Sequence, residues 1–141
     1  MIRQANKYDI DKIIDLLKDF AIKTNSQLKG SPLDWSKTYV MQLITNIIAG
    51  QGFILIDDKQ TGILIAFKNH CFWNDKSIQL QEVMLHGYNK FVIAKLIKEY
   101  IKIAKELLNK REINQAIMSS YNDLKFERYG MNKLEYIWEI K

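Results

Sequence analysis

The sequence predicts an α/β fold in which helices cover both faces of a mixed sheet. The hydrophobic period is helical before residue 50, strand-like over 53–85 and helical again over 90–110. An antiparallel run of strands followed by a helix and another strand also requires a parallel pair, since a strand–helix–strand connection returns in the same direction. A length of 141 residues corresponds to one domain, so we expect residues 1–141 to form a single domain.

The first third of the chain predicts one strand and two helices. Residues 2–5 alternate like a short strand, and Asn6 and Asp9 can cap a helix whose apolar residues recur from 10 to 21. Residues 25–32 interrupt the helical pattern. Asp34 can then cap a second helix over 35–48, which Gly50 and Gly52 would end.

The remainder predicts a strand meander, a long helix and a closing segment. Residues 53–56 and 63–67 should pair as an antiparallel hairpin, and a turn over 73–77 leads to a third strand over 78–85. Residues 90–110 form the longest amphipathic segment. A strand over 113–118, a short helix over 122–129 closed by Gly130, and a strand over 134–140 complete the order β–α–α–β–β–β–α–β–α–β.

Composition excludes several classes of protein. The chain is 48% hydrophobic and 26% charged, which excludes a disordered or low-complexity chain, and no apolar run approaches the length of a membrane span. We therefore expect no membrane partner and a cytoplasmic location, since the N-terminus also lacks a secretory signal. Cys71 alone can form neither an intramolecular disulfide nor a cysteine metal cage, so we expect no metal. The net charge of +5 suits anionic partners, but a Lys-, Ile- and Asn-rich bias also follows from AT-rich coding; we expect no nucleic-acid partner and leave a homodimer open.

Three local patterns, in order along the chain, resemble the GNAT superfamily of acyl-CoA N-acyltransferases. Arg3 followed by residues 9–17 (DIDKIIDLL) is similar to the family's first strand and helix. Residues 82–86 (EVMLH) resemble its fourth strand, just ahead of the cofactor loop. Residues 126–131 (FERYGM), followed by Glu135, resemble its closing motif. The order of elements matches over essentially the whole chain.

The resemblance implies acetyl transfer from acetyl-CoA to a primary amine, on a small-molecule or a protein acceptor, by direct attack on the thioester. It also implies that two central parallel strands separate, so that the main chain of the fourth strand binds pantetheine and the start of the following helix receives the pyrophosphate. Acetyl-CoA would be a co-substrate. The cofactor-binding residues implied in this way are Val83, Met84, Leu85, Gly87, Tyr88, Asn89, Lys90 and Phe91.

The chain departs from the family pattern at two places. The cofactor loop of the family carries several glycines, whereas this chain has only Gly87, with Phe91 and Ile93 at the later positions. Phe126 stands where many members have a tyrosine general acid, and a phenyl ring cannot donate a proton. Tyr129 and Tyr121 are the nearest alternatives, and we take Tyr129 as the candidate acid.

Glu82 is the candidate general base, because a carboxylate on the fourth strand could accept the proton of the attacking ammonium. The competing interpretation is an exposed surface glutamate. His86 could relay a proton or be an ordinary polar loop residue, and His70 and Cys71 are ordinary strand residues by pattern. Two groups of residues each have two possible roles. The aromatic residues could line an acceptor pocket or belong to the core; they are Trp35, Tyr39 and Trp73. Four lysines on one helix face could bind anions or simply be solvated; they are Lys95, Lys98, Lys102 and Lys105.

A second class of function is a degenerate GNAT-fold protein that has lost catalysis and acts as a binding or structural component. Small chains of this composition with degenerate loops resemble GNAT-like proteins encoded by tailed phages. Fold alone does not separate the two classes, whereas binding of acetyl-CoA does.

Overall fold

The computed structural model describes residues 1–23, 36–119 and 125–134. The strands are β1 (Ile2–Gln4), β2 (Gly52–Asp57), β3 (Gly62–Cys71), β4 (Asn74–Gly87) and β5 (Gln115–Ile117). The α-helices are α1 (Ile10–Lys23), α2 (Lys37–Asn46) and α3 (Lys90–Asn109). Shorter helical turns are η1 (Lys7–Asp9), η3 (Ile47–Gln51, a π-helical turn) and η4 (Phe126–Tyr129).

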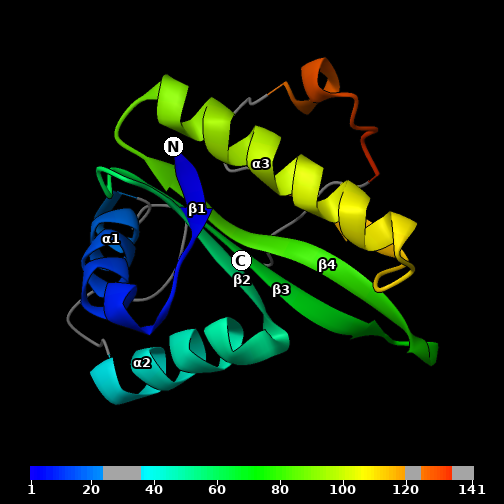
Figure 1. The fold of residues 1–141 in the computed structure, drawn as a ribbon, viewed down its shortest axis with the longest axis horizontal. Coiled ribbons are helices and arrows are strands. Elements are labelled where there is room, and N and C mark those ends of the chain that lie inside the picture. Colours follow the sequence, from blue (N-terminus) through cyan, green and yellow to red (C-terminus); the bar gives the residue numbers. More distant parts are fainter. Residues whose placement is uncertain (24–35, 120–124, 135–141) are drawn as a thin grey trace, which may run out of the picture.

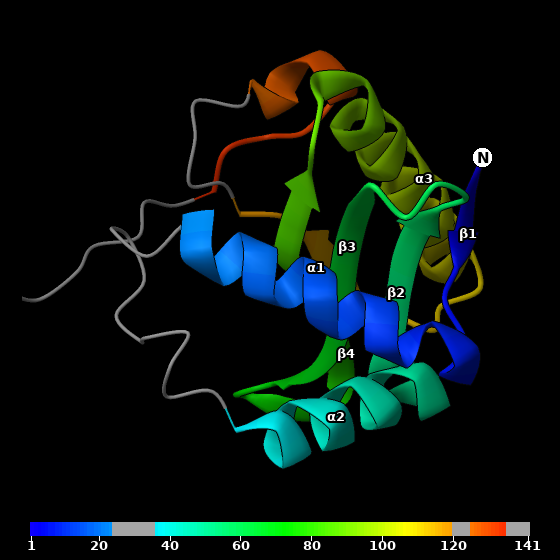
Figure 2. The same ribbon diagram turned by 90° about the vertical axis from the view of Figure 1, so that its left-hand side faces the viewer.

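The strands form one five-stranded sheet in the order β1-β2-β3-β4-β5. Neighbours are antiparallel except β4 and β5, which are parallel and are joined through α3. Helices α1 and α2 lie on one side of this sheet and α3 on the other (Figures 1 and 2). The predicted mixed sheet with helices on both faces is therefore confirmed.

Each face of the sheet carries its own apolar core. Along β2, Ile54 and Ile56 pack with the α1 and α2 side, while Phe53 and Leu55 pack with α3. The side chains of β3 divide in the same alternating way. This double burial explains why both strands are continuous apolar runs in the sequence and do not alternate with polar residues.

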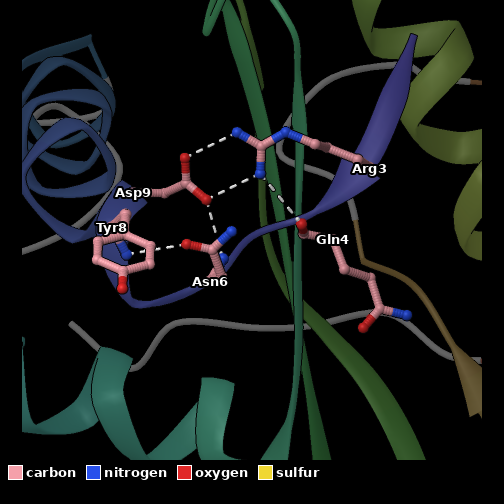
Figure 3. Close-up of polar contacts among 5 residues, drawn as sticks. All are labelled: Arg3, Gln4, Asn6, Tyr8 and Asp9. Carbon is pink, nitrogen blue, oxygen red and sulfur yellow. Dashed lines mark hydrogen bonds and ion pairs between the residues drawn. The ribbon is translucent and has the colours of Figure 1, made fainter.

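An ion pair near the N-terminus ties β1 to the start of α1. The Arg3 guanidinium donates to both carboxylate oxygens of Asp9 at 2.8 Å, and the Asn6 N–H donates to the same carboxylate at 2.9 Å (Figure 3). The Asn6 side chain in turn accepts from the Tyr8 N–H. The predicted capping roles of Asn6 and Asp9 are confirmed, and these hydrogen bonds hold the pKa of Asp9 below its usual value.

Several predicted boundaries differ from the observed ones. The predicted turn over 73–77 is mostly strand, because the β3–β4 pairing continues to Cys71↔Asn74 and leaves only Phe72 and Trp73 at the tip. The helix after residue 35 begins at Lys37 with Ser36 as its cap and ends at Asn46, before the π-helical turn. Gly130 closes η4 with a left-handed φ of 78°, as predicted. Asp34 and the predicted strand over 134–140 lie outside the described residues, apart from Leu134.

Two glycines allow α3 to pack directly on the sheet. Gly62 of β3 and Gly87 of β4 are paired, and both face the first turns of α3. A Cβ on Gly62 would lie 2.1 Å from Val92 Cγ1, whereas a Cβ on Gly87 would lie 3.0 Å from Ile93 Cγ1. Side chains at these two positions would therefore push the start of α3 away from the strands.

None of the helices in the described ranges combines the length and apolar character of a membrane span.

The Gly62–Val92 contact makes a testable prediction about stability. Gly62→Ala should destabilise the protein by about 2 kcal/mol, because overpacking a dense interior forces neighbouring atoms apart. Gly87→Ala should cost less, since a Cβ there would lie 3.0 Å from the nearest atom, against 2.1 Å at Gly62. In the double variant Gly62→Ala/Val92→Ala, the loss should be smaller than the sum of the single losses. Urea denaturation of the parent, the three single variants and the double variant measures these losses, and strict additivity of the Gly62→Ala and Val92→Ala losses would contradict the contact.

Candidate functional site

Strands β4 and β5 pair over only three residues each. The register joins Gln79, Leu80 and Gln81 of β4 to Gln115, Ala116 and Ile117 of β5. Strand β4 continues beyond this point to Gly87, and in the described part of the chain no strand pairs with that side of it. We call the point after Gln81 and Ile117 the fork. The family resemblance implies an opening between residues 82–85 and 113–118, and the pairing of β4 with β5 ends at Gln81 and Ile117.

A β-bulge lies immediately beyond the fork. The β3–β4 register passes from Ala66↔Glu82 to Ile65↔Met84, so Val83 has no partner on β3. Val83 is 48% exposed. An extra residue shifts the alternation of a strand by one position. Leu80 and Glu82 therefore face the α3 side, whereas Met84 faces the α1 side.

Glu82 is buried at the fork. Only 2% of the residue is exposed, so the interpretation as an exposed surface glutamate is wrong. Its Oε2 accepts a hydrogen bond of 3.2 Å from the Ser119 N–H, which follows β5. Burial raises the pKa of Glu82 to about 7, and the hydrogen bonds from Ser119 only partly oppose this effect. A carboxyl group with such a pKa can gain or lose a proton near neutral pH.

His86 lies on the opposite face of β4 from Glu82. It is a buried strand residue and not a loop residue, and its Nε2 lies 2.8 Å from Asp19 Oδ2 of α1. Its ring also contacts Phe20 and Tyr88 edge-on. Although burial acts to raise the pKa of Asp19, hydrogen bonds from His86 and Lys23 hold it below its usual value. His86 therefore joins the end of β4 to α1.

The turn before α3 already uses several of its main-chain donors. The Tyr88 N–H donates to Thr61 O at 3.0 Å, and the Asn89 side chain accepts from the N–H groups of Phe91 and Val92 at 3.0 Å each. The side chains of Tyr88 and Phe91 are exposed, and a lysine ammonium lies over each ring. These are Lys23, 4.6 Å from the Tyr88 ring centre, and Lys90, 5.7 Å from that of Phe91.

The other candidate residues are dispersed. Tyr129 is half-buried in η4, and no hydrogen bond joins it to Glu82 among the residues that the structure describes. Tyr39 and Trp73 are exposed, so a core role is wrong for both. Trp35 and Tyr121 lie outside the described residues. The four lysines of the α3 stripe are exposed, and the described ranges hold no group of three or more His, Cys, Asp or Glu that could bind a metal.

The burial of Glu82 predicts how stability depends on pH. Because its pKa is raised in the folded protein, its carboxyl group favours folding most below about pH 4.5, the unfolded value, and this contribution is lost as pH rises through about 7. Glu82→Gln should remove that loss, so its stability relative to the parent should improve by on the order of 3 kcal/mol between pH 4.5 and 8.

Urea denaturation across this pH range tests the prediction. Subtracting the two curves cancels the opposite contributions of Asp9, Asp19 and Asp57, whose pKa values are lowered. The matched control is Glu106→Gln on the exposed surface of α3. Parallel curves for the parent and Glu82→Gln would contradict a raised pKa at Glu82.

Comparison with known proteins finds similarity in structure only. No protein-family model matches the sequence, and no curated protein is a significant relative. A predicted acetyltransferase from Clostridium acetobutylicum, solved with acetyl-CoA, has a TM-score of 0.71 at 13% identity, covering 100% of this chain and 95% of that chain. A possible acetyltransferase from Clostridium difficile 630 has a TM-score of 0.67 at 14% identity, covering 100% and 96%.

A third similar structure is an aminoglycoside acetyltransferase from an uncultured soil metagenomic sample, in complex with sisomicin. Its TM-score is 0.59 at 11% identity, and the match covers 100% of this chain and 96% of that chain. At these identities the similarity concerns the fold alone. The element order, the mixed sheet and these neighbours together show that the chain has the GNAT fold.

Proposed function

We propose that this protein is an acetyl-CoA-dependent N-acetyltransferase that acts on a primary amine. The observation that carries the proposal is Glu82, a buried carboxyl group with a pKa of about 7, placed where β4 and β5 separate. Its setting in a fold shared with several named acetyltransferases supports the same conclusion. The aminoglycoside acetyltransferase among the similar structures supports an amine as the acceptor.

The free edge of β4 suits an extended donor molecule. Beyond Gln81 this edge has no strand partner in the described part of the chain, and the bulge exposes Val83. The main chain of Val83, Met84 and Leu85 would bind the amides of pantetheine as an added strand does. A main-chain N–H there would polarise the thioester carbonyl.

The start of α3 fits a pyrophosphate in part. Gly87, Tyr88, Asn89, Lys90 and Phe91 form the turn that would receive it, and Lys90 supplies positive charge. The N–H groups of Phe91 and Val92 are bonded to the Asn89 side chain. A phosphate at this turn would either displace the Asn89 carboxamide or use the remaining donors beside it.

The proposed reaction is direct attack of the amine on the thioester. The amine nitrogen bonds to the acetyl carbon, the carbon–sulfur bond breaks, and the thiolate leaves as coenzyme A. Glu82 takes the proton that the amine loses, directly or through water. Tyr129 is the proposed proton donor to the thiolate, since Phe126 has no proton to give. No acyl-enzyme intermediate forms in this mechanism.

Binding of acetyl-CoA is the first test of the proposal. Acetyl-CoA at 100 times its Kd should stabilise the protein by about 2.7 kcal/mol, which a thermal shift measures. Asn89→Asp keeps the helix cap but adds a negative charge at the turn, so it should weaken acetyl-CoA binding about tenfold in calorimetry.

The matched control for the added charge is Asn74→Asp, at the tip of the β3–β4 hairpin, where the side chain also accepts a main-chain N–H. Equal affinities of Asn89→Asp and the parent would place the phosphates elsewhere. Absence of any stabilisation by acetyl-CoA would favour the alternative, a non-catalytic GNAT-fold binding or structural protein.

Turnover tests the assignment of the base. Glu82→Gln should lower acetyl transfer by roughly 10²-fold or more with acetyl-CoA affinity nearly unchanged, because general-base assistance typically contributes 10² to 10⁴. The parent's kcat/KM should fall as pH drops below about 7, and the variant should lose that limb. Tyr129→Phe should also lower turnover. Full activity in both variants would exclude the proposed acid and base.

A further inference from the structure

The hydroxyl group of a tyrosine on α3 forms a hydrogen bond at the last paired position of β4 and β5. Tyr100 is 2% exposed, and its hydroxyl donates to Ile117 O of β5 at 2.7 Å, with Leu80 O of β4 at 3.4 Å. Leu80 and Ile117 belong to the last two of the three paired positions. One side chain thus contacts the main chain of both strands just before they separate.

The next contact across the fork is made by Glu82. Two residues after Ile117, the N–H of Ser119 points back to β4 and is accepted by the Glu82 carboxyl group at 3.2 Å. Two side chains therefore bind main-chain groups at the end of this pairing: Tyr100 binds the Ile117 carbonyl of β5, and Glu82 binds the N–H of Ser119, which follows β5. The orientation of the Glu82 carboxyl group depends on where the end of β5 is held.

We propose that Tyr100 is a positioning residue for Glu82: its hydroxyl fixes the end of β5, and through the Ser119 N–H this fixes the orientation of the Glu82 carboxyl group. The placement of Glu82 stands on the geometry of the fork alone. Its consequence for catalysis rests on the proposed acetyltransferase function.

The packing of α3 makes Tyr100 a rigid anchor. Leu96 and Ala104, on the same face of the helix, are buried against the sheet, and the Tyr100 ring lies 6.2 Å from that of Phe53. A phenylalanine would fill the same space without a polar group to satisfy. Burying a hydroxyl is unfavourable unless it is hydrogen-bonded, so the specific effect of the hydroxyl is the bond to the Ile117 carbonyl.

The pKa of Glu82 makes the inference measurable. Ser119 supplies the hydrogen bonds that oppose the effect of burial on Glu82, and no charged side chain of the described residues contributes to the pKa of Glu82. Loosening the Ser119 contact should therefore raise that pKa further. Burial and the Glu82 charge raise the pKa of Tyr100, so its hydroxyl remains a donor across this range.

The experiment follows the ¹³C chemical shift of the Glu82 carboxyl group with pH in the folded protein. In the parent the midpoint should lie near 7. Tyr100→Phe, which keeps the ring, should move the midpoint to higher pH and lower kcat by about tenfold at neutral pH, with the KM for acetyl-CoA changed less than about twofold. Tyr8→Phe, which removes an exposed hydroxyl, is the matched control and should change neither.

Ser119→Pro removes this N–H, together with the Ser119 hydroxyl that also lowers the Glu82 pKa, without touching α3, and it should move the Glu82 midpoint in the same direction. An unchanged midpoint in folded Tyr100→Phe would overturn the inference, as would a midpoint that Ser119→Pro leaves in place. The titration needs no activity, so the two proposals fail separately. If the parent transfers no acetyl group and the midpoint still moves in both variants, the positioning role stands and the acetyltransferase function fails.

Discussion

One extra residue in β4 decides which of its side chains face which core. Val83 has no partner on β3, so the alternation of the strand is offset there. Glu82 consequently joins the α3 side, beside Tyr100, while His86 reaches Asp19 of α1 on the opposite side. Without the bulge, Glu82, Met84 and His86 would share one face. The bulge therefore places Glu82 and His86 on opposite faces of β4, and it determines which residues surround the Glu82 carboxyl group.

The carboxyl groups of this protein show how donors and burial compete. Asp57 accepts from the Thr61 N–H, the Thr61 hydroxyl and the Gly62 N–H, and although burial acts against them, these bonds hold its pKa below the usual value. Asp9 has the Arg3 guanidinium and the Asn6 N–H. Glu82 has Ser119 as its donor and is more deeply enclosed, so burial prevails and its pKa rises. A residue kept at such a cost in stability is typical of functional sites.

Gly87, just before α3, leaves room for the helix to pack on the strands. Gly87 pairs with Gly62, and together they let Val92 and Ile93 approach the strands. At this turn the Asn89 side chain accepts hydrogen bonds from the N–H groups of Phe91 and Val92, and these bonds stabilise the start of the helix. The helix start is therefore well capped, and any anion must compete with or accommodate that cap.

The sequence by itself determined the local and periodic features: the β2–β3 hairpin, the long helix α3, the parallel return to β5, and the capping role of Asn6 and Asp9. These depend on residues close together in the chain, whose spacing records which face is buried. Only the tertiary structure decided the bulge at Val83, the burial of Glu82, and the contacts of His86 with Asp19, Ser119 with Glu82 and Tyr100 with Ile117. Those contacts join residues 67, 37 and 17 positions apart, and no local pattern encodes them, because strand register and helix placement are set by how two apolar cores fill on opposite faces of one sheet.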